Sequence, residues 1–329
     1  MNPVVMWRHP ATGRTLEVAE IQIEEDGLIK QGTLIEPMTG EQFPIREFIP
    51  RFVPPDNYAN SFGEQWNHFR STQLDRINGT TISRDRLRRT TKWPFDLQGE
   101  RILEVGCGAG RFTQVLLDTG AEVHSVDISS AVDACWKNNG PHPRLNLAQA
   151  DIYALPAPRD GFDKVLCFGV LQHTPDVEKS FFSLLPFVKP GGQLVIDVYI
   201  KERTWNRWNS KYLYRGLTKR LPRDLLRRFI EFYVPLWIPI DNTLSRIPYV
   251  RRVSQMLVPC WNYSDVFPLT PAMIREWAIL DTFDALSPAY DQPQTMETVR
   301  SWFERAGLID ISVEKGGTGI VGRARRPPL

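Results

Sequence analysis

The sequence predicts an α/β fold built on a doubly wound sheet of seven strands. Three observations predict it. Short apolar segments alternate with helical segments from residue 101 to residue 200, as in parallel sheets covered by helices on both faces. A glycine-rich turn joins the first of these strands to the first helix. Two strands near the end of the chain, with Gly316-Gly317 between them, predict a C-terminal antiparallel hairpin.

The elements of this core follow one another in a regular order. Strands are expected at residues 101–105, 121–126, 145–149, 162–168 and 193–199, and helices at 111–119, 129–138 and 177–187. After a long interruption the pattern resumes with a helix at 295–306 and strands at 309–314 and 319–323. We find no internal repeat.

The chain divides into five segments on this basis. They are a small β-rich N-terminal extension (1–55), a helical lid or connector (56–100), the core (101–200), a helical insertion after strand five (201–290), and the last helix and two strands (291–329). Prolines 222, 235, 239 and 248 are expected to break the insertion into short helices.

Composition places the chain among ordinary globular proteins. It has 329 residues, 42% hydrophobic and 24% charged, with a net charge of +2, which does not suggest a general nucleic-acid binder. No run of about 18 apolar residues predicts a membrane span, and the first residues lack the apolar run of a signal peptide. The four cysteines, at 107, 135, 167 and 260, match no disulfide or metal spacing. We therefore expect a cytoplasmic protein with reduced thiols and no metal site, whose activity survives chelation.

The glycine-rich turn is the strongest motif and points to a cofactor. It reads Ile-Leu-Glu-Val-Gly-Cys-Gly-Ala-Gly over residues 102–110. Gly106, Gly108 and Gly110 would let the chain turn tightly and let a ligand lie against bare backbone. Glu104 precedes them by two positions. Its carboxylate would repel a pyrophosphate but would favour the ammonium and sulfonium groups of S-adenosylmethionine (SAM), directly or through a bridging water.

Residues after the next strands complete this expected cofactor site. Asp127 ends the second strand, where a carboxylate can accept hydrogen bonds from ribose hydroxyls. Asp151 follows the third strand and could accept from the adenine amine, with Ile128 and Ile152 packing on the ring. Gly169, after the fourth strand, is expected to line the same pocket. A turn without a ligand and a nicotinamide site remain as alternatives.

Residues 101–200 resemble the class I SAM-dependent methyltransferases, in particular the group that contains ubiquinone and menaquinone methyltransferases. The resemblance lies in Leu103–Arg111, Val123–Ser129, Gln149–Pro156, Phe162–Asp176 and Leu184–Gly192. It implies a Rossmann-like fold, SAM as cofactor and methyl transfer. It does not imply an acceptor, because this family methylates oxygen, nitrogen, carbon, sulfur and metalloids.

The N-terminal extension has a weaker resemblance. Residues 30–55 are similar, through Pro44–Pro54, to a small zinc-ribbon-like domain that accompanies some methyltransferases. Residues 1–55 contain no cysteine, so we expect a docking or scaffold role rather than a zinc site.

His173 is the candidate catalytic base. It follows the fourth strand, at the carboxyl edge of the sheet where ligands bind, and an imidazole suits proton transfer near neutral pH. The alternative is a histidine that only shapes the pocket, since the position commonly carries histidine in this family whatever the acceptor.

Residues expected to contact the acceptor come from three places. Tyr199 ends strand five. Tyr58, Trp66 and Arg70 could form a lid, and Asp284 and Tyr290 belong to an acidic segment, 280–291, that we read as a loop. Packing and helix capping are the alternatives for these residues.

The insertion is locally basic. From Lys201 to Arg228 ten Lys or Arg stand against two acids, and aromatic residues lie among them. We expect Arg223, Arg227 and Arg228 to face an anionic or amphiphilic acceptor. A further hypothesis is a peripheral membrane contact through residues 201–258. A merely solvated helix face is the alternative.

The sequence therefore predicts a SAM-dependent methyltransferase acting on a small molecule. The acceptor atom is expected to be an oxygen on a sugar, a lipid-linked intermediate or a secondary metabolite. The alternative is a regulatory or scaffold protein that binds SAM without turnover.

Overall fold

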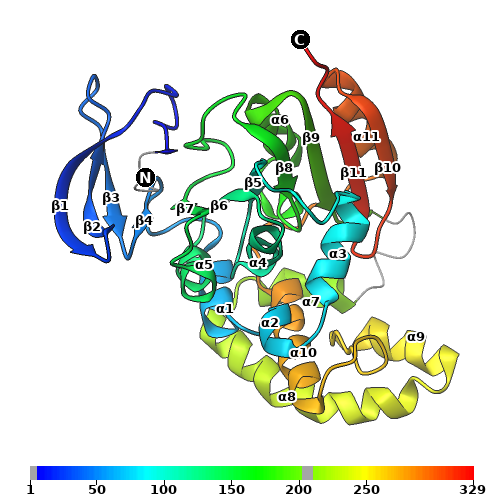
Figure 1. The fold of residues 1–329 in the computed structure, drawn as a ribbon. Coiled ribbons are helices and arrows are strands. Elements are labelled where there is room, and N and C mark those ends of the chain that lie inside the picture. Colours follow the sequence, from blue (N-terminus) through cyan, green and yellow to red (C-terminus); the bar gives the residue numbers. More distant parts are fainter. Residues whose placement is uncertain (1–5, 202–209) are drawn as a thin grey trace.

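A seven-stranded mixed sheet forms the centre of the molecule in the computed structural model, which describes residues 6–201 and 210–329 (Figure 1). Its order is β10-β11-β9-β8-β5-β6-β7. The strands are β5 (Arg101–Val105), β6 (Glu122–Asp127), β7 (Leu145–Gln149), β8 (Phe162–Cys167), β9 (Val188–Val198), β10 (Ile309–Lys315) and β11 (Ile320–Arg325). Strands β5 to β9 pair in parallel, and β11 joins β9 and β10 in antiparallel fashion. The predicted fold class is confirmed, including the C-terminal hairpin.

Helices cover both faces of this sheet. They are α3 (Ile82–Thr91), α4 (Arg111–Asp118) and α5 (Ala131–Asn139) on one face, and α6 (Val177–Leu184) and α11 (Met296–Arg305) on the other. Neighbouring strand residues alternate between the two faces. Ile102 packs in a cluster with Leu87, Val115 and Val132, whereas Leu103 packs in the cluster that contains Phe181. Apolar residues at consecutive positions of β5 thus fit a sheet that is buried on both sides.

The N-terminal extension is a separate antiparallel sheet. Its order is β1-β2-β3-β4, with β1 at Glu17–Glu25, β2 at Leu28–Ile35, β3 at Gln42–Arg46 and β4 at Ile49–Pro50. It lies beside the β7 edge of the central sheet (Figure 1). Arg51 joins the two sheets, because its guanidinium donates to Gln149 Oε1 at 3.0 Å and contacts Asp133 Oδ1 at 2.5 Å.

Two further groups of helices lie at the carboxyl end of the parallel strands. The first contains α1 (Asn60–His68) and the short α2 (Asp75–Asn78). The second is the insertion, with α7 (Ser210–Thr218), α8 (Arg223–Leu244), α9 (Pro248–Leu257) and α10 (Pro271–Leu286). Phe69 packs with Leu226, Ile230 and Val234 of α8 and with Phe283 of α10, so the two groups share one apolar cluster. No helix of the described chain is long and apolar enough to cross a membrane.

The structure corrects two expectations about the insertion. Pro235 and Pro239 lie inside α8, which continues over 22 residues; only Pro222 and Pro248 stand at helix starts. Proline removes a backbone donor and crowds the preceding turn, but packing of α8 against α10 keeps the helix continuous. The second correction is that the acidic segment 280–291 is not a loop throughout, since 280–286 belong to α10.

Candidate active site

A cavity of about 1830 Å³ opens at the carboxyl edge of the parallel strands. Its floor is made by the glycine-rich turn and the ends of β5, β6 and β8, and its walls by α1, α3, α7 and α10. The predicted site residues that line it are Tyr58, Trp66, Gly106, Gly108, Asp127, Ile128, Ile152, Gly169, His173, Tyr199 and Asp284. The fold thus brings together residues that are far apart in the sequence.

The glycine-rich turn has a backbone that other residues would strain. Gly106, Gly108 and Gly110 have φ values of +83°, +52° and +84°, which favour glycine. A Cβ on Gly106 would lie 2.0 Å from a methyl of Val170, and one on Gly110 would lie 2.1 Å from Asn139 Nδ2. Gly106 and Gly108 therefore present bare backbone to the cavity, whereas Gly110 makes room for α5.

Asp127 is held at the cavity wall by the turn itself. Its Oδ2 accepts from the Gly108 N–H at 2.9 Å, and its Oδ1 accepts from the Ser129 N–H and hydroxyl at 2.8 and 2.7 Å. Burial raises the pKa of this carboxyl. Oδ2 keeps a second lone pair for a ligand hydroxyl, and Ile128 and Ile152 add apolar walls beside it. A nucleoside fits this combination.

Glu104 and Asp151 lie just behind the cavity rather than in its wall. Glu104 is 3% exposed, and its Oε2 accepts from the hydroxyls of Thr113 and Ser125 at 2.5 and 2.7 Å. Burial raises its pKa to about 7. Asp151 accepts from the Tyr153 N–H at 3.1 Å, and burial also raises its pKa. A contact of either carboxylate with SAM stays a prediction.

The ring of His173 is oriented by a backbone carbonyl. His173 ends the 3₁₀ turn Leu171–His173 after β8, and its Nδ1 lies 2.9 Å from the carbonyl oxygen of Tyr290. Because a carbonyl only accepts, Nδ1 carries the proton and Nε2 is the basic nitrogen. Burial lowers the pKa of His173, so the imidazole is neutral at pH 7. The centre of the His173 ring lies 5.0 Å from the centre of the Phe62 ring and 5.4 Å from the centre of the Tyr199 ring.

Charged residues of α7, of α10 and of the segment just after α10 lie near Tyr199. The Tyr199 hydroxyl lies 3.5 Å from Asp284 Oδ2, and burial raises the pKa of Asp284. Lys211 Nζ lies 4.3 Å from the centre of the Tyr199 ring and 2.9 Å from Asp291 Oδ2. Asp291 is almost fully buried and also faces Arg215 at 3.9 Å. This wall of the cavity is therefore polar and balanced in charge.

A second polar group was not anticipated from the sequence. The Tyr263 hydroxyl donates to Asp281 Oδ2 at 2.5 Å, and both residues line the cavity with Arg111. Burial lowers the pKa of Arg111 to about 9, and its guanidinium lies 5.4 Å from the centre of the Trp277 ring. The sequence signals for this group were that Arg111 directly follows the glycine-rich turn and that Asp281 belongs to the acidic segment 280–291.

Some predicted acceptor contacts lie away from the cavity. Arg70 donates to Asn138 Oδ1 of α5 at 3.2 Å, and the Tyr290 ring packs 5.8 Å from that of Tyr58; neither side chain is among the lining residues. The tyrosine reaches the site only through its carbonyl.

The basic residues of α8 also correct an expectation. Arg223 pairs with Glu64 at 3.0 Å, and Arg227 pairs with Asp224 and Glu231 at 3.2 and 2.8 Å. These arginines and Arg228 do not line the cavity. Most of the cations that line it come instead from α3 and the residue that follows it, namely Arg86, Arg88, Arg89 and Lys92, and the insertion contributes Lys211.

Comparison with known proteins finds similarity to methyltransferases over part of the chain. Residues 103–196 match a family described as a methyltransferase domain. The chain is 33% identical over 149 residues to a ubiquinone biosynthesis O-methyltransferase of Coxiella burnetii, covering 45% of this chain and 61% of that protein. It is also 35% identical over 223 residues to an uncharacterised protein of Synechococcus sp., and this match covers 63% of this chain and 47% of that protein.

Solved structures with a similar arrangement include human N-acetylserotonin methyltransferase in complex with SAM. That similarity has a TM-score of 0.45 at 15% identity and covers 84% of this chain and 61% of that one. The chain spans about three fifths of the length of the first curated relatives that it matches. Residues 103–196 thus match a methyltransferase domain, and the sheet order and the glycine-rich turn agree with the predicted resemblance to class I SAM-dependent methyltransferases.

Proposed function

We propose that the protein transfers a methyl group from SAM to a hydroxyl oxygen of a small, amphiphilic aromatic acceptor. The observation that carries the proposal is the orientation of His173, whose basic Nε2 belongs to a ring that lines the cavity while Nδ1 is bound to the Tyr290 carbonyl. A base in this position suits a hydroxyl, which must lose a proton as it becomes the nucleophile.

The cofactor side of the cavity supports SAM as the methyl donor. Gly106 and Gly108 would hold the methionine part against bare backbone, and Asp127 would hold the ribose, with Ile128 and Ile152 beside the adenine. When bound, SAM supplies a sulfonium-linked methyl group that is open to in-line attack. The protein aligns the acceptor oxygen, excludes water and takes up the hydroxyl proton at His173 Nε2.

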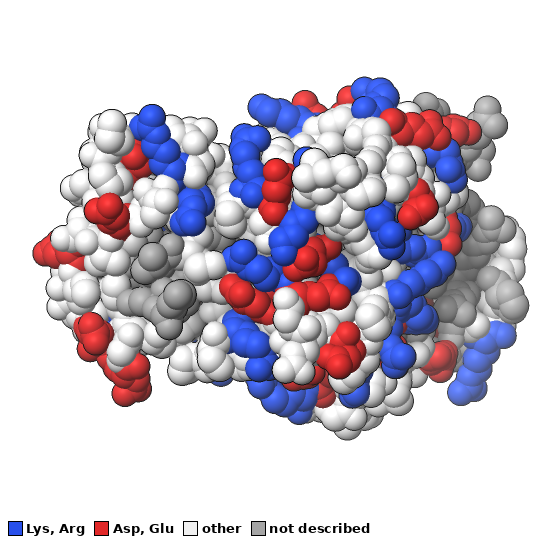
Figure 2. Space-filling model, turned by 45° about the horizontal axis from the view of Figure 1, so that its top comes forward, with Lys and Arg blue, Asp and Glu red and all other residues white. Residues whose placement is uncertain are grey.

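The walls of the cavity favour an aromatic acceptor with an anionic group. Aromatic rings line it from several elements, among them Tyr58, Trp66, Phe112, Tyr199, Tyr263 and Trp277. The α3 cations stand beside the same space. The matched relative of Coxiella burnetii acts, by its name, in ubiquinone biosynthesis, which favours a phenolic ring over the sugar oxygen expected from the sequence. On the face shown in Figure 2 acidic and basic side chains interleave, which favours a small molecule over nucleic acid.

Labelled methyl transfer tests this function. The purified chain is incubated with isotope-labelled SAM and a cell extract, and labelled products are identified by mass spectrometry. We expect label in a phenolic ether. Stoichiometric SAM binding with no labelled product in any extract would instead favour the regulatory or scaffold alternative.

We further propose that α8 holds the protein on an anionic membrane surface. Leu225, Phe229, Phe232, Leu236 and Ile240 recur every three or four residues, so they form one stripe along the helix, and they are 47–69% exposed. The opposite side of α8 is already buried against α10. Lys219, Arg220, Arg228 and Arg246 are exposed on and around the same helix. An apolar stripe accompanied by cations is typical of helices that lie in the headgroup region.

Vesicle binding tests this surface. Phe229→Glu with Phe232→Glu should abolish co-sedimentation with vesicles containing phosphatidylglycerol, at unchanged methyl transfer to a soluble acceptor. The matched control is Ile21→Glu with Ile23→Glu, which places the same charges on two exposed residues of β1. If the native chain instead forms a dimer that the α8 pair disrupts, and binds no vesicle, the stripe is covered by a second copy and the membrane proposal is wrong.

A further inference from the structure

Two turns of the N-terminal sheet repeat one five-residue pattern. His9–Gly13 reads His-Pro-Ala-Thr-Gly, and Glu36–Gly40 reads Glu-Pro-Met-Thr-Gly. Each turn has a polar first residue, then proline, threonine in the fourth place and glycine in the fifth. Gly13 and Gly40 have nearly the same φ, +70° and +72°.

The hydrogen bonds of the two turns also correspond one to one. In each turn the carbonyl of the first residue accepts from the N–H of the glycine, at 2.8 Å from Gly13 and 2.9 Å from Gly40. The side chain of the first residue accepts from the N–H groups of the third and fourth. His9 Nδ1 lies 3.3 and 3.1 Å from these donors, and the Glu36 oxygens lie 3.2 and 2.8 Å from theirs.

The threonine in the fourth place makes the same hydrogen bond in both turns. The hydroxyls of Thr12 and Thr39 each accept from the N–H two positions later, on Arg14 and Glu41, at 3.4 and 3.3 Å. In both turns, therefore, the first and fourth side chains are directed by backbone N–H groups. In metal sites with cysteine ligands, backbone N–H groups likewise donate to the ligand side chain and orient it. There the acceptor is the cysteine sulfur, whereas here it is a nitrogen of His9 or an oxygen of Glu36, Thr12 or Thr39.

The spacing is that of a zinc ribbon. Such a site takes two pairs of ligands, each pair separated by two residues, from two distant turns. Positions 9 and 12 form one such pair and positions 36 and 39 the other. The side chains here are His, Thr, Glu and Thr, and within residues 6–201 and 210–329 no group of three or more His, Cys, Asp or Glu is placed to hold a metal ion.

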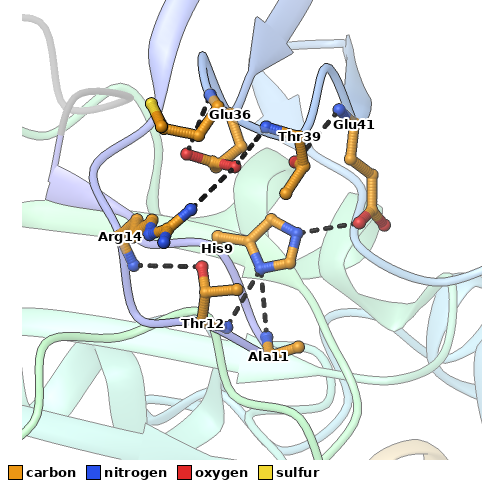
Figure 3. A network of polar contacts seen from close by, with 8 residues as sticks. His9, Ala11, Thr12, Arg14, Glu36, Thr39 and Glu41 are labelled. Atoms are coloured by element: carbon orange, nitrogen blue, oxygen red, sulfur yellow. Dashed lines mark hydrogen bonds and ion pairs between the residues drawn. The ribbon is translucent and has the colours of Figure 1, made fainter.

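Side-chain contacts join the first residue of each turn to the residue that directly follows the other turn (Figure 3). Because His9 Nδ1 accepts two N–H groups, its proton is on Nε2, which donates to Glu41 Oε2 at 2.8 Å. Arg14 Nη1 faces Glu36 Oε2 at 3.9 Å. Both contacts join one turn to the other, and His9 and Glu36 are 4% and 1% exposed. We call these two contacts the polar clasp.

We propose that the N-terminal sheet retains the backbone of a two-turn zinc site in which the polar clasp has replaced the metal. Positions 9, 12, 36 and 39 keep the directions of the four ligands. In the native protein the polar clasp stabilises the N-terminal sheet without metal. Cysteine side chains at positions 9, 12, 36 and 39 should restore metal binding.

Cobalt binding tests the latent site. The variant His9→Cys/Thr12→Cys/Glu36→Cys/Thr39→Cys should bind one Co²⁺ with the absorption of a tetrahedral thiolate site, and Zn²⁺ should displace it and raise the unfolding temperature. The control variant Thr12→Cys/Thr39→Cys, with half the thiols, should bind at least tenfold more weakly. A quadruple variant with native circular dichroism that binds no Co²⁺ would overturn the proposal.

The native side chains provide a second test that needs no new site. Glu36→Ala should speed hydrogen exchange at the N–H groups of Met38 and Thr39 at least tenfold, whereas Glu25→Ala, which removes an exposed partner of Lys30, should not. EDTA should change neither the exchange rates nor the unfolding temperature of the native chain. Unchanged exchange in Glu36→Ala would show that Glu36 does not hold its turn, and loosening of the native sheet by EDTA would show that a metal still does; either result would overturn the proposal.

Discussion

Replacement of His173 by glutamine is expected to lower kcat by roughly 100- to 10,000-fold, the usual contribution of a positioned general base. SAM affinity should stay close to native, because the residues proposed to hold the cofactor belong to the glycine-rich turn and the ends of β6 and β7. Stopped assays with labelled SAM give kcat, and calorimetry gives the affinity. A His173→Gln protein with native kcat would leave this residue with only a role in shaping the pocket.

The pH profile of kcat/KM further distinguishes a general base at His173 from a residue that only shapes the pocket. Burial lowers the pKa of His173 from its ordinary value of 6.5, so the neutral, basic form persists to lower pH than in a free imidazole. kcat/KM should therefore be constant above pH 6.5 and should fall as the pH drops through the lowered pKa. The His173→Gln variant should lose this acidic limb. An identical limb in both proteins would show that another group causes it.

The second large effect is expected at Asp127. Asp127→Ala removes one or two hydrogen bonds between a carboxylate and ribose hydroxyls, each contributing about 1.5–3 kcal/mol, so SAM should bind at least roughly tenfold more weakly. Asp127 also fixes the Gly108 and Ser129 N–H groups, and the loosened turn would add to the loss. Calorimetric titration with SAM measures the affinity.

Two further variants make this result interpretable. Asp127→Asn keeps one acceptor oxygen and should lie between the native and alanine proteins. Asp118→Ala, at the exposed end of α4, should bind SAM as the native chain does. Native affinity in a folded Asp127→Ala protein would show that the ribose is held elsewhere.

The central sheet could be predicted from the sequence because its signals are local. Buried parallel strands are short apolar runs, and the turn at Gly106 needs glycine whatever surrounds it. The acidic residue that ends β6 and the one that follows β7 are indicated by the same local pattern. None of these features depends on contacts between distant segments.

The insertion was predicted less well because its structure depends on packing. The prolines of α8 indicated several helices, but the contact of α8 with α10 outweighs their local cost. Asp281 and Asp284 suggested a loop, yet they lie on the part of α10 that lines the cavity. Charge counts along the chain could not distinguish a helix face directed to solvent from one directed to the site, so Arg223 was assigned to the acceptor and Lys211 was not.

The two repeated turns of the N-terminal sheet could not be recognised from the sequence for a different reason. Five residues with three identities are too short to stand out in a search for internal repeats. The match became visible through hydrogen bonds between backbone and side chain, which no composition or periodicity reports.

The carbonyl of Tyr290 links the protonation of His173 to the path of the backbone just after α10. Because this carbonyl oxygen accepts from Nδ1, the position of the main chain at residue 290 sets which nitrogen of His173 is basic. The contact uses no side-chain atom of Tyr290. A substitution of the Tyr290 side chain is therefore expected to leave the tautomer of His173 unchanged, whereas an insertion or deletion that shifts the backbone between α10 and residue 290 is expected to alter it.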